Sequence, residues 1–99
     1  MKIYLSGPIT WRKQDETKAK FAQAAKQVEA FGHEPVNPFD NGLSENDTYM
    51  RHMAARIAAM FKCEGIYRLN GWEDDAEARL EDLIAGEVGL EIIDQPQFK

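Results

Sequence analysis

Short apolar runs alternate with helix-like segments along the 99 residues of the chain, and this order limits the possible folds most strongly. The apolar runs predict four buried strands, at residues 2–6, around Val36, at 65–69 and at 90–93. Apolar side chains at three- and four-residue spacing predict three helices, at residues 15–31, 50–61 and 75–88. Strands that alternate with helices pair in parallel through right-handed crossovers. The order therefore predicts one α/β domain, over residues 1–99, with a doubly wound open sheet.

The expected sheet has a ligand-binding edge. In such sheets, ligands bind beyond the carboxyl ends of the strands, near the point where the strand order reverses. The turn-forming segments that follow the strands, at Gly7-Pro8, Asn37-Pro38 and residues 70–75, should share this edge. Residues 39–48, "FDNGLSENDT", are rich in turn formers and predict a long loop, which is a common place for functional residues.

The composition narrows the class of partner. The formal net charge of −5 disfavours a nucleic acid polymer, whose binding depends on neutralising phosphates with Lys and Arg. Cys63 is the only cysteine, so we expect no intramolecular disulfide and no metal site around it. The start "MKIYLSGPIT" lacks the apolar core of a signal peptide, and no apolar run approaches membrane-spanning length. We therefore expect a cytoplasmic protein without a membrane partner. Because a chain this short buries a modest share of its surface, we also expect a homo-oligomer.

Glu81 occupies an unusual position on the third predicted helix. On a helical wheel it falls between Val88 and Ala85, inside a broad apolar arc. The arc consists of Ala76, Ala78, Leu80, Leu83, Ile84, Ala85 and Val88. One interpretation is a carboxylate that reaches water or is satisfied by a neighbouring polar group. The other is a partly desolvated carboxylate that faces the ligand crevice and attacks a bound electrophile.

Glu77 lies one helical turn before Glu81 and also falls within the arc. Two carboxylates four residues apart share a helix face, and such a pair could divide into a nucleophile and an acid. The helix dipole gives a simpler explanation, because acidic residues are favoured in the first turn of any helix. This explanation also covers Asp74 and Asp75.

Several segments, taken in order, resemble one family. They are "KIYLSGPIT", "AFGHEPVNP", "CEGIYRLNGWEDD", the "ARLE" that contains Glu81, and "AGEVG" before an apolar strand. Together they resemble the small nucleoside 2-deoxyribosyltransferase-like proteins, including short phage and bacterial members of undescribed function. The resemblance covers nearly the whole chain. It implies a Rossmann-like (flavodoxin-like) three-layer domain with a parallel sheet of about four strands and helices on both faces.

The resemblance also implies a reaction and a substrate. In that family a Glu at the position of Glu81 attacks C1′ of a nucleoside and releases the base, and a second base or water then resolves the glycosyl ester. This chemistry needs no metal or organic cofactor. The residue six positions earlier, here Asp75, holds the 5′ end of the sugar. A carboxylate there should repel a 5′-phosphate, which favours nucleosides, although Arg12, Lys13 or Arg68 could offset its charge.

Further substrate-binding candidates have structural alternatives. Ser6, Gly7 and Pro8 could bring backbone amides against the base or sugar, or could simply form the turn that ends a strand. Tyr4 and Trp72 could stack on a base, or could belong to the core. Asn37 could bind the ligand or initiate the turn before Pro38. Asp47 and Tyr49 are candidate contributions to the site of a neighbouring subunit, and Met50, Met53 and Met60 are candidates for the pairing surface.

One departure from the family pattern leaves the function open. The family usually has a small residue, commonly Gly, four positions before the nucleophile, whereas this chain has Glu77. A large acid there could narrow the pocket, and we include Glu77 among the candidate substrate-binding residues. The alternative function is a module that binds a nucleoside or nucleotide without turnover. A third possibility is an interaction protein that uses its acidic surface and the loop at residues 39–48.

Overall fold

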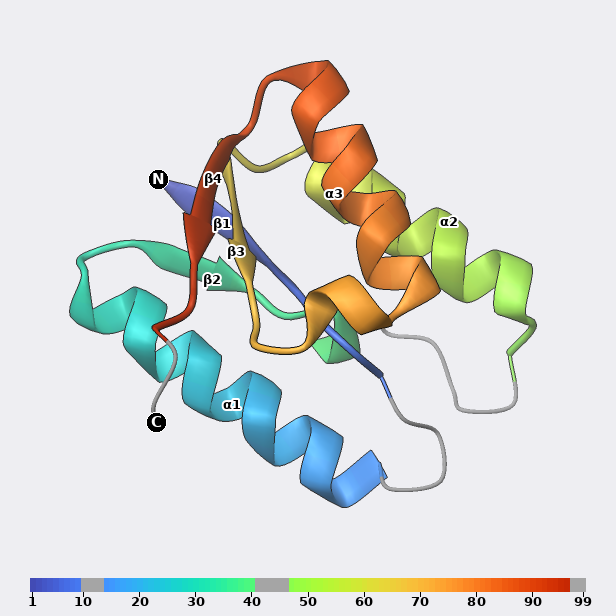
Figure 1. Cartoon of the computed structure of the whole chain (residues 1–99), viewed down its shortest axis with the longest axis horizontal. Coiled ribbons are helices and arrows are strands. Elements are labelled where there is room, and N and C mark those ends of the chain that lie inside the picture. The colour runs from blue at the N-terminus through green and yellow to red at the C-terminus, as the bar shows by residue number, and fades with distance from the viewer. Residues whose placement is uncertain (10–13, 41–46, 97–99) are drawn as a thin grey trace.

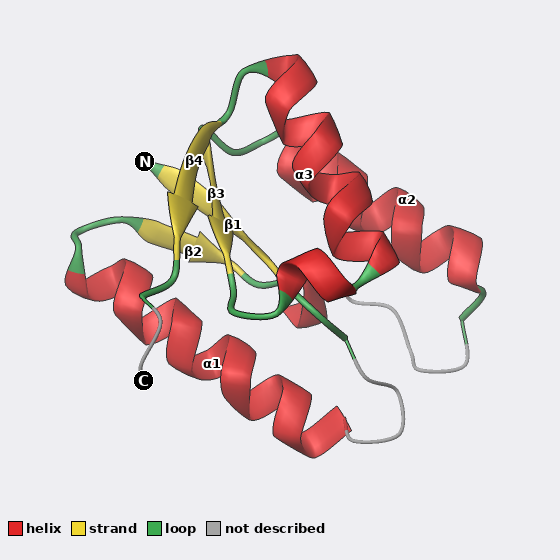
Figure 2. Cartoon of the chain, viewed as in Figure 1, coloured by secondary structure: helices red, strands yellow, loops and turns green. Residues whose placement is uncertain are grey.

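The computed structural model describes residues 1–9, 14–40 and 47–96. Figures 1 and 2 show a sheet with helices packed on both sides. The elements follow in the order β1 (Lys2–Ser6), α1 (Gln14–Ala30), β2 (Glu34–Val36), η2 (Pro38–Asp40), α2 (Tyr49–Met60), β3 (Gly65–Arg68), η3 (Trp72–Asp74), α3 (Ala76–Val88) and β4 (Glu91–Asp94). The α/β class and the four strands predicted from the sequence are confirmed.

The sheet has the strand order β2-β1-β3-β4, and each neighbouring pair is parallel. The order reverses between β1 and β3, because the chain leaves β1 toward one edge of the sheet and leaves β3 toward the other. Helix α1 covers one face, and α2 and α3 cover the other (Figure 1). The chain after β1 and the chain after β3 therefore diverge to opposite faces at this point, which is where sheets of this type bind ligands.

Strand β1 supplies both layers of the core through the two-residue alternation of its side chains. Ile3 and Leu5 pack in a cluster with Phe21 of α1, whereas Tyr4 packs in a second cluster with Met60 at the end of α2. Ser6, the last residue of the strand, follows the same alternation as Tyr4. This register brings two hydroxyl groups to the face that α2 and α3 cover.

Local sequence explains where the helices begin and end. Thr48 caps α2 by accepting a hydrogen bond from the backbone N–H of Arg51, and Asp75 caps α3 by accepting from that of Ala78. Gly89 ends α3 with φ at 80°, in the left-handed region where glycine carries no steric penalty. In the described part of the chain, no helix combines the length and the apolar character needed to span a membrane.

The centre of the buried face of α3 differs from the wheel prediction. Its buried residues are Ala78, Glu81 and Ala85, whereas Leu80, Leu83 and Val88 are exposed, Leu83 to 62%. The wheel was centred on the bulky residues, but the two alanines allow α3 to approach the sheet closely and leave the larger side chains outside. Glu81 therefore lies in the middle of the buried stripe, whereas the helical wheel predicts it only as one member of a wide apolar arc.

Helix α2 shows the same correction. Its buried residues are Met53, Arg56 and Met60, whereas the apolar residues at its two ends, Met50 and Phe61, are exposed. The stripe with buried residues at i, i+3 and i+7 is the one that meets the sheet, and it contains a cation at its centre. The two helices on this face thus each bury a charged residue.

Candidate active site

Three donors surround the carboxylate of Glu81, which has no exposed surface. The hydroxyl of Tyr4 donates to Oε2 over 2.5 Å, and the hydroxyl of Ser6 donates to Oε1 over 2.9 Å. The guanidinium of Arg56 donates to Oε1 from Nη2 over 3.0 Å. The donors come from β1 and α2, so the site joins segments far apart in the sequence. The partners satisfy the charge that burial would otherwise destabilise.

Arg56 links the two carboxylates of α3. It is only 4% exposed, and its Nη1 donates to Oε2 of Glu77 over 2.5 Å while Nη2 binds Glu81. Burial alone lowers the pKa of Arg56, but the charge of Glu81 and the hydrogen bonds to Tyr4 and Glu77 raise it above its ordinary value. Arg56 therefore stays charged. The guanidinium thus bridges the carboxylates of Glu77 and Glu81.

Tyr4 acts as a neutral donor in this network. Burial raises the pKa of its hydroxyl well above the usual value, and the negative charge of Glu81 raises it further. The hydroxyl keeps its proton at physiological pH and directs it to Oε2 of Glu81. The ring of Tyr4 belongs to the buried cluster on this face, which is the core alternative predicted from the sequence, and its hydroxyl donates to the Glu81 carboxylate.

Among the described residues, the hydrogen bonds leave one acceptor position on Glu81. A carboxylate has about four lone-pair positions on its two oxygens. Oε1 accepts from Ser6 and Arg56, and Oε2 accepts from Tyr4 alone. One lone pair of Oε2 thus has no donor among the described residues. An attack by this carboxylate on an electrophile would use Oε2, while the donors hold the charge and orientation of the group.

Asp75 and Asn37 both serve local structure. Oδ2 of Asp75 accepts from the backbone N–H of Ala78 and caps α3. This bond fixes the carboxylate at the helix start, with its other oxygen outside the cap. Oδ1 of Asn37 accepts from the backbone N–H of Phe39 and begins the 3₁₀ turn η2. For Asn37 the structure shows the turn-initiating role that the sequence left as one alternative.

The segment Ser6-Gly7-Pro8 divides between the two faces of the sheet. Ser6 binds Glu81, whereas Pro8 lines a cavity on the side of α1. Gly7 is required by packing, because a Cβ atom there would lie 2.7 Å from Cβ of Leu69. Of the three residues, Ser6 alone is brought to Glu81.

Trp72 lies at the β4 side of the sheet edge. The guanidinium of Arg68 stacks on its ring, 4.3 Å from the centroid. Arg68 is in turn bound to Asp82 and to both carboxylate oxygens of Asp94. Arg68, a predicted candidate for offsetting the repulsion of a 5′-phosphate, is thus bound by Asp82 and Asp94, and its guanidinium covers one face of the Trp72 ring.

The remaining sequence candidates lie at the start of α2 or outside the described residues. Arg12, Lys13 and most of the loop at 39–48 are outside them. Asp47 forms an ion pair with Arg51 over 2.9 Å. Tyr49 is exposed, and the charge of Glu77 raises the pKa of its hydroxyl. Within residues 1–9, 14–40 and 47–96, no three His, Cys, Asp or Glu side chains converge on a position that could hold a metal ion.

Arg56 is the site residue that sequence reasoning missed. A signal was present: Arg56 lies on one stripe of α2 with Met53 and Met60, so the wheel argument applied to Glu81 would also have marked an arginine on a buried face. Two opposite charges on the buried faces of successive helices indicate an ion pair between them.

Comparison with known proteins places this architecture in a family. Residues 1–94 match the family model described as a domain of unknown function, DUF4406. The chain belongs to the DUF4406 family. Comparison with curated proteins gives no match.

Among solved structures, the DUF4406 chain is similar to a 2-deoxyribosyltransferase from the psychrotolerant bacterium Bacillus psychrosaccharolyticus. The TM-score is 0.72 at 15% sequence identity, and the match covers 95% of this chain and 71% of the other. At this identity the likeness concerns the fold. It confirms the fold that the resemblance implied.

Proposed function

We propose that this DUF4406 protein cleaves the N-glycosidic bond of a deoxyribonucleoside or related nucleotide, with Glu81 as the nucleophile. Oε2 of Glu81 forms a bond to C1′ while the C1′–N bond breaks. The electron pair of the C1′–N bond leaves with the base, which takes up a proton from solvent water. A second base, or water that loses a proton, then attacks C1′ and releases the Glu81 carboxylate. The first outcome is transfer and the second is hydrolysis.

The observation that carries the proposal is the environment of the Glu81 carboxylate. Tyr4, Ser6 and Arg56 hold it in one orientation and leave one lone pair of Oε2 without a described donor. The same donors stabilise the carboxylate when it departs from the glycosyl ester, which favours the second step. Position on the fold supports the assignment, because the neighbouring Ser6 ends β1 at the carboxyl edge of the sheet.

Asp75 is the proposed contact for the sugar. One of its oxygens caps α3, and we assign the other to accept a hydrogen bond from a free 5′-hydroxyl. Its negative charge disfavours a 5′-phosphate at the same place. This assignment predicts a preference for nucleosides over their monophosphates, and neither a metal nor an organic cofactor is required.

The test compares Glu81→Gln with Glu87→Gln, an isosteric change at an exposed position on the same helix. Each protein is incubated with a panel of 2′-deoxynucleosides and 5′-monophosphates, and free base is measured by liquid chromatography. We expect Glu81→Gln to lose base release by about 10³-fold or more and Glu87→Gln to match the wild type. A 2′-fluoro nucleoside, whose fluorine slows hydrolysis of the ester, should add one glycosyl mass to a peptide containing Glu81. Base release that survives Glu81→Gln would refute the nucleophile.

The complete burial of Glu81 and its ion pair with Arg56 favour a second candidate function, a nucleoside-binding module without turnover. In this case the carboxylate would serve the fold and the sheet edge would bind the ligand. A nucleoside would then raise the melting temperature of the protein while no base is released over long incubation, because a ligand that binds only the folded state stabilises it. Turnover by the wild type excludes this candidate.

We also propose that the protein forms a homo-oligomer. Support comes from the exposed apolar side chains of α3, Leu80, Leu83 and Val88, which a second copy could cover. Light scattering after size-exclusion chromatography should give the wild type a mass above the 11.3 kDa of one chain. Leu83→Glu should bring the measured mass closer to that of the monomer. A wild-type monomer at all concentrations would refute the assembly.

A further inference from the structure

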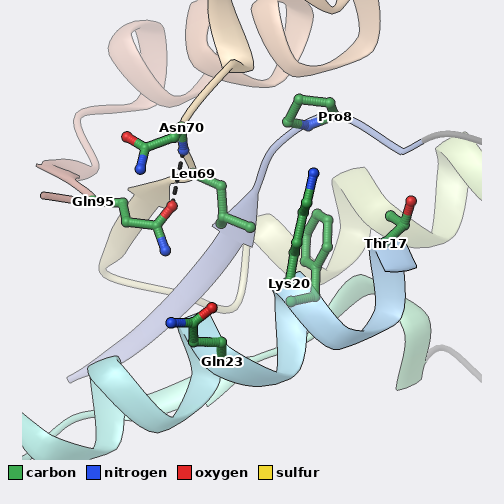
Figure 3. Close-up of a pocket in the computed structure, with 8 residues that line it drawn as sticks. Pro8, Thr17, Lys20, Gln23, Leu69, Asn70 and Gln95 are labelled. Carbon is green, nitrogen blue, oxygen red and sulfur yellow. Dashed lines mark hydrogen bonds between the residues drawn. The ribbon is translucent and has the colours of Figure 1, made fainter. Parts of the chain in front are cut away.

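A hollow lies on the opposite side of the sheet from Glu81. Its volume is about 250 Å³, and its walls come from the chain after β1, β3 and β4 together with α1. Pro8 follows β1, Leu69 and Asn70 follow β3, and Gln95 follows β4 (Figure 3). It therefore opens at the carboxyl edge, beside the point where the chain diverges after β1 and β3, which is the position where such sheets bind ligands.

Hydrogen bonds fix one wall of this hollow. The backbone N–H of Asn70 donates to Oε1 of Gln95 over 2.9 Å (Figure 3), and the side-chain amide of Asn70 donates to the carbonyl of Pro96. The amide of Gln95 donates to Gln27, which also accepts from the hydroxyl of Tyr67. These bonds connect the chain after β3 and β4 to α1. The wall is thus preformed, which reduces the ordering that a ligand would otherwise require.

The hollow is positively charged in an acidic protein. Lys20 is the only charged residue among the described residues that line it, while the whole chain has a formal net charge of −5. Figure 3 shows Lys20 extending from α1 toward Pro8, along the hollow. Within the described ranges Lys20 forms no ion pair, although Glu16 lies one turn earlier on the same helix. An ammonium group beside a low-dielectric wall attracts an anion.

The remaining lining adds shape and polarity. Phe21, Leu69 and Pro8 provide an apolar surface, and Gln23 and Asn70 provide amide groups. Because a water molecule takes up about 30 Å³, the volume of about 250 Å³ equals about eight waters and fits one ring with a short substituent. We propose that this hollow binds a small cyclic organic anion, with its carboxylate or phosphate at Lys20 and its ring against Phe21 and Leu69. The site is independent of Glu81 and of the proposed reaction.

The test uses 4-hydroxybenzoate as the probe and its neutral isostere 4-hydroxybenzamide as the matched control. Binding to the full ¹⁵N-labelled chain is followed by nuclear magnetic resonance at the side-chain amides of Gln23, Asn70 and Gln95. We expect the resonances of these side-chain amides to shift with 4-hydroxybenzoate until the site is saturated. The control compound 4-hydroxybenzamide should bind about fivefold more weakly. Inorganic phosphate, which lacks a ring, should also bind more weakly than 4-hydroxybenzoate.

Variants separate the site from other lysines and from the reaction. Lys20→Gln should weaken 4-hydroxybenzoate binding about fivefold, whereas Lys26→Gln, at another exposed position on α1, should leave it unchanged. Glu81→Gln should also leave it unchanged, because Glu81 lies on the other face. Absence of shifts at these amides, equal binding of the amide probe, or equal binding by Lys20→Gln would each overturn the proposal. Binding of phosphate as strong as that of the ring compound would overturn the proposed contact with Phe21 and Leu69.

Discussion

Replacement of Arg56 by methionine tests the buried network most directly. Methionine has a long unbranched side chain that can replace the aliphatic part of Arg56, but it cannot donate a hydrogen bond to a carboxylate. The change removes the donor to Oε1 of Glu81 at 3.0 Å and the donor to Oε2 of Glu77 at 2.5 Å. Glu81 then keeps only Tyr4 and Ser6 as partners among the described residues, and its charge loses the cation that Arg56 places beside it.

The expected loss is a large part of the stability of the domain. Removing one partner of a buried ion pair costs about 3–5 kcal/mol, out of about 5–15 kcal/mol for a typical domain. Glu77 is partly exposed and can return to water, so Glu81 accounts for most of the loss. With a urea dependence of about 1–3 kcal/mol per molar for small proteins, a loss of about 3 kcal/mol lowers the unfolding midpoint by about 1–3 M.

The assay is urea unfolding at pH 7, followed by circular dichroism, on the wild type, Arg56→Met, Glu81→Gln and the double variant. The neutral amide introduced by Glu81→Gln accepts from one of the two hydroxyls through its oxygen and donates an N–H to the other, which can rotate its own proton away. The double variant should therefore recover at least about 1.5 kcal/mol relative to Arg56→Met. Arg51→Met is the control, because Arg51 forms an exposed pair with Asp47 and should change stability by less than about 1 kcal/mol. A loss for Arg56→Met as small as that of the control, or a double variant less stable than Arg56→Met, would refute the ion pair.

Two further predictions concern other parts of the fold. Gly7→Ala should destabilise the protein by about 1–3 kcal/mol, because the new Cβ would clash with Leu69. Gly86→Ala should stabilise α3 by about 0.5–1 kcal/mol, because a Cβ at this position has no neighbouring atom within 4 Å. Thermal unfolding of both variants checks these opposite effects. The hydrogen bonds from Arg68 hold the pKa of Asp94 below its ordinary value of 3.8, so their stabilisation is present above this pH and is lost as the pH falls through the lowered pKa. Asp94→Asn should therefore lower the free energy of unfolding by less than about 1 kcal/mol at pH 7, since Asp94 is largely exposed. The melting temperature of the variant should converge with that of the wild type in acid. A difference in melting temperature that grows in acid would contradict the prediction.

The sequence alone determined the order of the elements and the class of the fold. Alternating strand and helix patterns allow few topologies, because parallel strands need crossovers and crossovers are right-handed. The caps also follow local chemistry, because Thr48 and Gly89 lie at the positions that their residue types favour. These properties depend on neighbours within a few positions, which the sequence contains directly.

The sequence also marked Glu81 as a carboxylate on a buried face, but only the tertiary structure decided what surrounds it. Arg56 and Glu81 are separated by 25 positions, and their contact depends on how two helices rotate about their axes when they pack on the sheet. That rotation follows from the fit of small residues such as Ala78 and Ala85 against the strands, and it left Leu83 exposed. Packing depends on the shapes of both surfaces together, so the spacing along one helix does not determine it.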